Sequence, residues 1–284
     1  MKTLKRPRST DRVGVRREAR SRRHRRALEL MTGMNIPFLV GGGHALRHYT
    51  GGVRGTKDLD VFVRRPDAQA LLNGMSAAGF KTDLTFPHWL GKVHVEGDYI
   101  DVIYGSGNGL TEVDDHWFTY SHPATVLGVP VTLCPPEEMI WSKSFVMERE
   151  RYDGADVSHL IRAFRGRLDW RRLLDRFGPH WRVLLSHLIL FGFIYPGERE
   201  AIPTDVMLGL CRVLERDAGR THADQRLCRG TLLSREQYLT DISRWGYEDG
   251  RLIPHGQLTT EDVERWTAAI DPRKGEDDAG GRSR

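Results

Sequence analysis

Residues 38 to 63 read FLVGGGHALRHYTGGVRGTKDLDVFV, and this stretch decides the fold. The apolar run at 36 to 40 is typical of a buried strand, and it ends on three consecutive glycines. Residues 44 to 49 suit one or two helical turns, which end at a pair of glycines. LDVFV at 59 to 63 predicts a second strand. The chain is therefore expected to run strand, glycine turn, short helix and strand in close succession.

Two carboxylates lie at the start of the second predicted strand. Asp58 and Asp60 are two residues apart, so their side chains should leave the same face of the strand about 7 Å apart. Unpaired carboxylates this close repel each other, and carboxylate oxygens are ligands that suit a hard divalent cation. Asp101 interrupts the otherwise apolar strand YIDVIY at 99 to 104. We expect it to supply the third carboxylate from a neighbouring strand.

Gly41, Gly42 and Gly43 lie between the first strand and the N-terminus of the short helix. A glycine turn in this place lets backbone N–H groups approach a phosphate, which the helix dipole also favours. A phosphate cradle beside a carboxylate triad indicates a site for a nucleoside triphosphate bound through Mg²⁺. In a two-metal mechanism, ions about 4 Å apart activate the attacking hydroxyl and stabilise the leaving pyrophosphate.

Taken together, these motifs resemble the DNA polymerase β-like nucleotidyltransferase superfamily, and most of all its bacterial members related to the AbiEii abortive-infection toxins. The segments that carry the resemblance are GGGHAL, VRGTKDLDVFV, YIDVIYG and PPEEMIWSKSFVMERERYDGADVSHLI, which fall between residues 41 and 161. The resemblance implies an α+β fold, with a small mixed sheet and helices in a nucleotidyltransferase domain, followed by a helical region.

The same resemblance implies roles for individual residues. Asp58, Asp60 and Asp101 would be metal ligands for Mg²⁺ or Mn²⁺, and Asp101 would also act as the base toward the acceptor hydroxyl. Lys143 would approach the triphosphate, and Asp153 and Asp156 would support the site from the helical half. The nucleotide contacts implied are Gly41, Gly42, Gly43, His44, Thr56 and Lys57. One position departs from the family pattern, because many members have a serine or threonine where this chain has Gly43 followed by His44.

The expected activity is Mg²⁺-dependent transfer of a nucleoside monophosphate from an NTP to a hydroxyl. The resemblance favours RNA, such as the end of a tRNA, or a protein as acceptor, and a small molecule is the next choice. It also suggests a toxin–antitoxin or phage-defence component with an antitoxin partner. The alternative is a catalytically silent nucleotide- or RNA-binding protein of the same fold, which the change at His44 motivates.

Charge is distributed unevenly along the 284 residues. Residues 1 to 26 hold twelve lysines and arginines and two acids, whereas the remainder holds 31 bases and 36 acids. The basic character therefore belongs to an N-terminal arm rather than to the body. Residues 1 to about 15 are predicted to be disordered, and a helix is expected from about Arg16 to Met34. The arm is either a solvated leader or a contact for RNA phosphates.

The cysteines and the most apolar run bear on the cellular compartment. Cys134, Cys211 and Cys228 show no metal-ligand spacing, and an odd number argues against a disulfide framework. Residues 183 to 196 are too short and too interrupted for a membrane span, so we expect a buried helix there and no membrane partner. No apolar segment follows the N-terminal charges as in a secretory signal. A cytoplasmic location is the prediction.

The remaining patterns give the expected domain organisation. The strands at 92 to 96 and 99 to 104 flank Gly97-Asp98 and predict a hairpin with Asp98 in the turn. A helix is expected from Pro66 to about Ala78, and another from Pro136 to Met147. Beyond about residue 157 the spacing predicts helices throughout. The predicted segments are an arm at 1–26, a nucleotidyltransferase domain at 27–156, a helical region at 157–270 and a disordered tail at 271–284.

Overall fold

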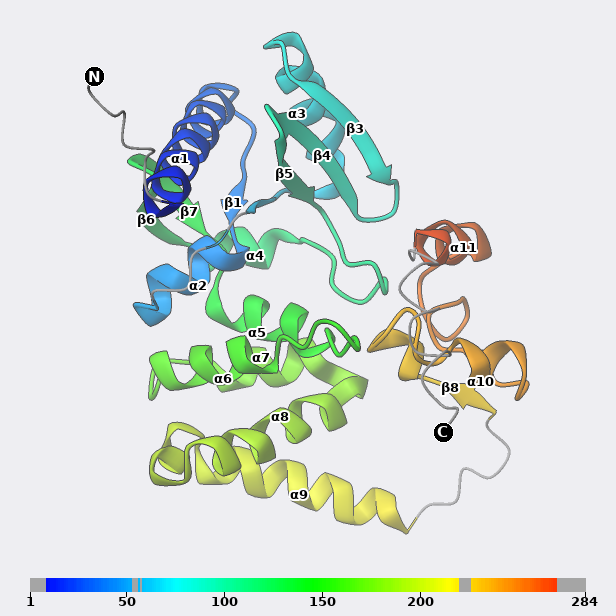
Figure 1. Cartoon of the computed structure of the whole chain (residues 1–284). Coiled ribbons are helices and arrows are strands. Elements are labelled where there is room, and N and C mark those ends of the chain that lie inside the picture. Colours follow the sequence, from blue (N-terminus) through cyan, green and yellow to red (C-terminus); the bar gives the residue numbers. More distant parts are fainter. Residues whose placement is uncertain (1–8, 53–55, 57, 220–225, 270–284) are drawn as a thin grey trace, which may run out of the picture. The chain divides into compact units, whose positions relative to one another are not determined.

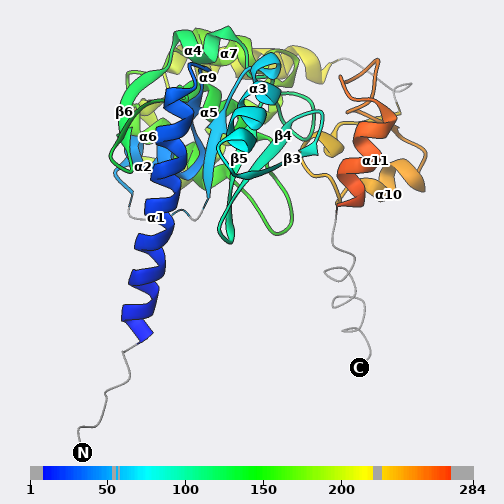
Figure 2. The ribbon, with the colours of Figure 1, turned by 90° about the horizontal axis from the view of Figure 1, so that it is seen from above.

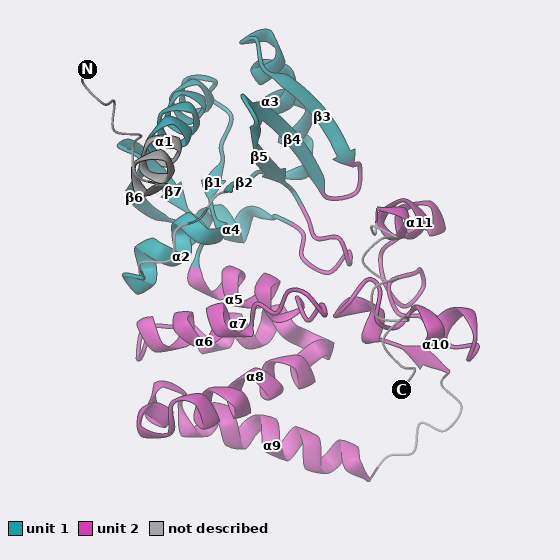
Figure 3. Cartoon of the chain, in the orientation of Figure 1, with its two compact units in different colours: residues 1–85, 90–104, 113–135 teal, residues 86–89, 105–112, 136–284 magenta. Residues whose placement is uncertain are grey.

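The computed structural model describes residues 9–52, 56, 58–219 and 226–269 (Figure 1). Lys57 and the predicted tail at 271–284 lie outside the described residues. The chain forms two compact units, which Figure 3 distinguishes by colour: residues 1–85, 90–104 and 113–135, and residues 86–89, 105–112 and 136–284. The segment from residue 136 to 156, which the sequence analysis assigned to the first domain, clusters with the second unit.

A seven-stranded mixed sheet forms the framework of the first unit, in the order β3-β4-β5-β2-β1-β7-β6. Its strands are β1 (Leu39–Val40), β2 (Leu59–Phe62), β3 (Lys81–Phe86), β4 (Leu90–Val95), β5 (Asp98–Ile103), β6 (His122–Val126) and β7 (Val129–Leu133). β2 is parallel to β5 and antiparallel to β1, while β1 is parallel to β7. The predicted α+β class is confirmed, although β3 was not expected.

One face of the central strands is covered by helix α3 (Arg65–Ala77). Leu71, Leu72 and Met75 of this helix are fully or almost fully buried. The helix lies over β4 (Figure 2). Gly91 of that strand leaves room for Leu72 of the helix. Alternate residues of β2 and β5 are buried in the same core, so the opposite face of these strands carries the polar side chains. The other helices of the unit are α1 (Ser9–Gly33), α2 (Gly42–Thr50) and α4 (Asp115–Thr119).

Helix α1 begins at Ser9, so the prediction of disorder up to about residue 15 is wrong for the described part of that segment. Arginine favours helices, and the apolar residues at its C-terminal end anchor the helix. Ala27, Leu28 and Met31 have no exposed surface. The C-terminal half of α1 is therefore packed into the first unit rather than held out as a free arm.

Asp98 joins this helix to the sheet. Its Oδ2 accepts hydrogen bonds from Arg20 Nε at 2.9 Å and Arg23 Nη2 at 3.0 Å. The prediction that Asp98 is a turn residue is wrong, because Glu96 and Gly97 form the turn with positive φ angles and Asp98 begins β5. Burial acts to raise the pKa of Asp98, but the two arginine hydrogen bonds outweigh it and leave the pKa below its ordinary value.

The second unit contains five longer helices followed by a smaller subdomain. The helices are α5 (Pro136–Ser144), α6 (Gly154–Ala163), α7 (Trp170–Phe177), α8 (Trp181–Ile194) and α9 (Thr204–Ala218), with short 3-10 turns η1 (Gly178–His180) and η2 (Pro196–Ala201). The prediction of helices throughout is wrong beyond α9. There β8 (Leu227–Cys228) and β9 (Glu248–Asp249) form a short parallel pair beside η3 (Gly230–Leu232), α10 (Leu239–Ser243) and α11 (Thr260–Ala268).

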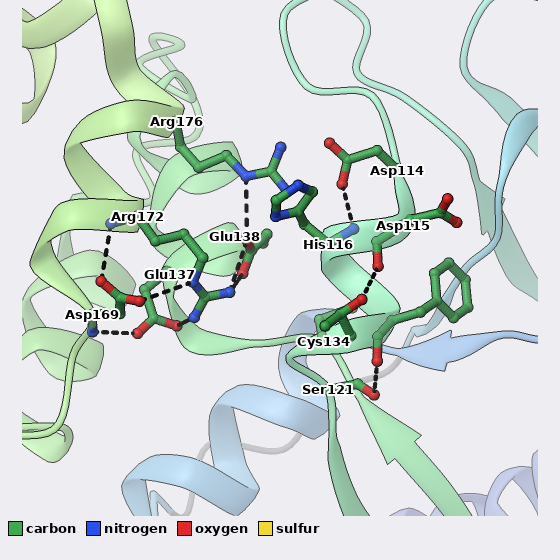
Figure 4. Close-up of polar contacts among 12 residues, drawn as sticks. Asp114, Asp115, His116, Ser121, Cys134, Glu137, Glu138, Asp169, Arg172 and Arg176 are labelled. Atoms are coloured by element: carbon green, nitrogen blue, oxygen red, sulfur yellow. Dashed lines mark hydrogen bonds and ion pairs between the residues drawn. The ribbon is translucent and has the colours of Figure 1, made fainter.

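Buried ion pairs join α5 to α7 (Figure 4). Arg172 donates to both Glu137 and Glu138, with 2.9 Å between Nη1 and Oε2 of Glu138, and Arg176 Nε lies 3.2 Å from Oε1 of Glu138. Glu138 is fully buried, and this burial raises its pKa although both arginine charges oppose the change. Glu137 and Glu138, which lie in the first turn of α5, therefore join two helices.

Helix α8 is apolar on both faces. Leu184, Leu188 and Phe191 are buried, whereas Phe193 is 82% exposed, so the predicted buried helix is buried on one face only. The stretch Trp170–Ile194, which includes α7 and α8, is long and apolar enough to cross a membrane by length and composition, and the mean hydropathy of its most apolar 18-residue window is 1.2. About a third of its most apolar window is buried within the protein. The three cysteines are free thiols.

We expect Asp98→Asn to destabilise the protein by about 1–2 kcal/mol at pH 7, because two arginine hydrogen bonds lose their charged acceptor. Since the pKa of Asp98 is lowered on folding, its contribution is present above the unfolded pKa of about 3.9 and is lost as the pH falls through the folded pKa. Urea unfolding at several pH values should show the two proteins converging below about pH 4.

Asp115→Asn is the matched control, since Asp115 pairs with Arg64 in the same unit but its side chain is 81% exposed. It should cost less than about 0.5 kcal/mol. Equal effects of the two substitutions would contradict the role given to Asp98.

Candidate active site

Two of the three predicted carboxylates lie side by side on one face of the sheet. Asp60 of β2 and Asp101 of β5 are register partners on adjacent parallel strands, so their side chains leave the same face side by side. Asp58 immediately precedes β2, two residues before Asp60. The structure therefore places Asp60 and Asp101 together as the sequence predicted, with Asp58 at the strand entrance.

The glycine turn at residues 41 to 43 lies directly against Asp60, in the row of carboxylates that Asp60 and Asp101 form on this face of the sheet. Gly41 N donates to Asp60 O at 3.0 Å, and α2 begins at Gly42 with a φ of +52°. A Cβ atom on Gly42 would stand 1.6 Å from Asp60 Oδ2, a distance that no side chain tolerates. Position 42 thus requires glycine for two reasons, which are the left-handed backbone and the Asp60 carboxylate. A Cβ on Gly43 would similarly meet Thr56, at 2.6 Å from its Cβ.

Thr56 orders the entrance to β2. Its Oγ1 donates to Asp58 O at 3.0 Å and accepts from Asp58 N at 3.3 Å. This pair of local hydrogen bonds fixes the backbone immediately before the carboxylates. Thr56 therefore supports Asp58, while the nucleotide contact predicted for it stays a prediction.

His44 lies in the first turn of α2, and its imidazole is neutral at physiological pH. Burial lowers its pKa to about 4, and the charges of His24 and Arg47 act in the same direction. His24 of α1, which the sequence analysis did not single out, is 2% exposed, and its Nε2 has no hydrogen-bond partner among the described residues. Burial lowers the pKa of His24 as well, against the charges of Asp98 and Asp58. At neutral pH neither imidazole carries the charge needed to bind a phosphate as a cation.

Lys92 of β4 joins the same row, and sequence reasoning missed it. It is the register partner of Asp101, and its Nζ donates to Asp101 Oδ1 at 2.9 Å. The ammonium also lies 3.5 Å from the ring centroid of Tyr99. The alternation of KVHVE across the predicted hairpin was the available signal, because it places Lys92 on the same face as Asp101.

Asp58 and Asp60 suit a hard divalent cation by the chemistry of their donors, since both offer carboxylate oxygens, and the Asp60 carboxylate stands against a backbone that carries no Cβ at Gly42. Within the described ranges, no three His, Cys, Asp or Glu side chains gather closely enough to hold a metal ion. The Asp101 carboxylate is engaged by Lys92. The three-ligand set of the sequence analysis therefore stays a prediction.

Lys143 belongs to the second unit, where it is enclosed by the acids named with it. Its Nζ donates to Asp153 Oδ2 at 2.9 Å and to Asp156 Oδ2 at 2.7 Å, and Arg151 also pairs with Asp153. Burial acts to raise the pKa of Asp153, but the Arg151 hydrogen bond and the Lys143 charge outweigh it and lower the pKa. The segment is thus a tight ion-pair cluster, and its predicted contact with a triphosphate stays a prediction.

Comparison with known proteins gives partial likenesses only. No family model matches the chain, and no curated protein matches it. Among solved structures, the antibiotic-resistance factor ANT(2'')-Ia is 16% identical with a TM-score of 0.42, over 60% of this chain and 97% of that one. The lincosamide antibiotic adenylyltransferase LnuA, bound to lincomycin, is 15% identical with a TM-score of 0.35, over 47% and 90% of the two chains. An antigenic nucleotidyltransferase-like protein from Paracoccidioides brasiliensis is 17% identical with a TM-score of 0.35, over 59% and 90%.

We expect Gly42→Ala to destabilise the protein by more than the roughly 1 kcal/mol that a left-handed backbone costs an alanine, because the new methyl group would collide with the Asp60 carboxylate. Gly51→Ala is the matched control, since Gly51 at the C-terminal end of the same helix also has a positive φ of 66° but, among the described residues, has no atom within 4 Å of its Cβ position. Urea unfolding of both variants measures the difference.

The double variant Gly42→Ala/Asp60→Ala should recover part of the loss, since it removes the colliding oxygen. Equal destabilisation by the substitutions at positions 42 and 51 would contradict a close contact between Gly42 and Asp60.

Proposed function

We propose that this protein is a Mg²⁺-dependent nucleotidyltransferase that transfers a nucleoside monophosphate from an NTP to a hydroxyl acceptor. The observation that carries the proposal is the position of the Asp60 carboxylate, which stands against the glycine at the N-terminus of α2 and in register with Asp101. A carboxylate row beside a helix N-terminus offers negative oxygens for a cation and N–H groups for a phosphate in one place.

The proposed chemistry assigns a task to each group. Asp58 and Asp60 would hold the cation, which when bound would neutralise triphosphate charge and assist the departure of pyrophosphate. Gly42 and Gly43 would let the phosphate chain approach the backbone. Asp101 would accept the proton of the acceptor hydroxyl. The hydroxyl oxygen would form a bond to the α-phosphorus, while the bond from that phosphorus to the bridging oxygen of the pyrophosphate breaks.

RNA is the acceptor class that we propose first, and a toxin–antitoxin or phage-defence role would follow from it. Exposed arginines on the packed part of α1 support this choice, since they could neutralise phosphates near the first unit. These are Arg22, Arg25 and Arg26. A protein hydroxyl and a small molecule remain as acceptors for the experiment to distinguish.

A catalytically silent binding protein is the second candidate. The specific observation in its favour is the Lys92–Asp101 ion pair, which engages the proposed base. Such a protein would bind a nucleotide with Mg²⁺ and transfer nothing.

The test is incubation with each α-³²P-labelled NTP, Mg²⁺ and total bacterial RNA. We expect label to move onto RNA, and we expect Asp60→Asn to reduce the rate by at least about 100-fold, because a neutral amide is a poor ligand for Mg²⁺. Asp67→Asn, a change of the same kind in the first turn of α3, should retain the rate.

Label on the protein itself would redirect the proposal to a protein acceptor. No transfer to RNA, to protein or to a panel of small hydroxyl compounds, with Mg²⁺-dependent nucleotide binding intact, would overturn the transferase in favour of the silent binder.

A further inference from the structure

Helix α8 of the second unit carries an apolar face that is exposed to solvent. It consists of four side chains that are 40% to 82% exposed, which are Ile189, Leu190, Phe193 and Ile194. Residues four apart lie next to each other on a helix, so Ile189 adjoins Phe193 and Leu190 adjoins Ile194. The four side chains therefore form one continuous surface, which we call the α8 patch.

The α8 patch is large for the surface of a monomer. Its exposed fractions correspond to about 400 Å² of apolar surface, which lies in the range of the largest patch on a typical monomer, and such patches are often functional. Two copies of the patch facing each other would bury about 800 Å², and the polar residues around them would bring the total above the roughly 1,000 Å² expected of a specific interface.

Charged side chains flank the patch along the chain. Residues 183 to 194 contain no Asp, Glu, Lys or Arg. Arg182 near the start of α8 pairs with Asp217 of α9. The η2 turn after α8 holds two further acids in ion pairs, Glu198 with Arg162 and Glu200 with Arg165. An apolar centre inside a polar rim is the arrangement typical of a protein–protein interface.

The charges of this rim nearly cancel. Arg199 of η2 adds one more base, which donates to the Gly192 carbonyl at 3.4 Å. Four arginines and three acids thus leave a single net positive charge beside the patch. Two copies of such a surface can approach each other with little electrostatic repulsion. An anionic membrane surface would instead favour a cluster of lysines and arginines around the apolar residues.

The rest of the chain offers little that could cover the patch. The sequence outside the described residues holds only four large apolar side chains, which are Met1, Leu4, Val53 and Ile270. A second copy of the chain, in contrast, brings an apolar surface of the same size and the same balanced rim. A two-fold axis through the patch would place this surface on itself, as in most homodimers.

We propose that the α8 patch is the interface of a homodimer, in which α8 of one copy packs against α8 of the other. Phe193 would be the central anchor, because it is the most exposed member of the patch and large aromatic side chains are enriched among the residues that dominate binding. The proposal goes beyond the nucleotidyltransferase function proposed above and does not depend on it.

The experiment is sedimentation velocity of the full-length protein at concentrations from about 1 to 100 µM, the range in which an interface of this size is expected to associate. We expect the wild type to reach twice the mass of the chain. Phe193→Asp should raise the dissociation constant at least about 100-fold, because dimer formation would bury an unpaired charge. Ile189→Asp should act in the same direction, and Phe193→Leu should retain most of the association.

Trp245→Asp is the matched control, since Trp245 is an aromatic residue of the same unit that is 58% exposed. It should leave the dissociation constant unchanged, and far-UV circular dichroism checks that each variant is folded. A wild type that stays monomeric at the highest concentration would overturn the proposal, as would a dimer that persists in both aspartate variants of α8. A monomer that floats with phospholipid vesicles, and no longer does so as Phe193→Asp, would assign the patch to a membrane instead.

Discussion

The parallel pairing of β2 with β5 is the constraint on which the candidate site depends. Asp60 is opposite Asp101 in this register, and the buried residues Val61 and Val102 are opposite each other on the other face. A slip of one residue would exchange the carboxylates for valines on the polar face and bury the acids. The same apolar contacts that stabilise the core therefore fix the positions of the acids.

Close approach at Gly42 extends this constraint to the turn. The Asp60 carboxylate occupies the space that any larger residue at position 42 would need, and the hydrogen bond from Gly41 N to Asp60 O joins the turn to β2. Burial keeps the imidazoles of His24 and His44 neutral at physiological pH, whereas hydrogen bonds from two arginines of α1 keep the Asp98 carboxylate charged. Arg20 and Arg23 of α1 and Lys92 of β4 are paired with acids of the sheet.

The sequence was sufficient for features that depend on local alternation and turns. Asp60, Asp101 and Gly42 could be placed because the strand period and the glycine run are local signals. The Lys92–Asp101 pair and the anchoring of Asp98 depend on which strand or helix lies beside which, and this is decided by tertiary packing. All residues of β3 are exposed or partly exposed, so its sequence has no clear apolar alternation. β8 and β9 have two residues each, which is too short for a strand period to be seen in the sequence. The exposed face of α8 was missed because hydrophobicity alone does not say which side of a helix finds a partner.

The most direct measurement is an anomalous difference map from crystals grown with Mn²⁺ and inorganic triphosphate, a probe that carries no base. The account predicts a Mn²⁺ peak at about 2.1 Å from carboxylate oxygens of both Asp58 and Asp60, with the phosphates beside the N-terminus of α2. A peak elsewhere in the protein, or triphosphate bound away from the glycine turn, would contradict it.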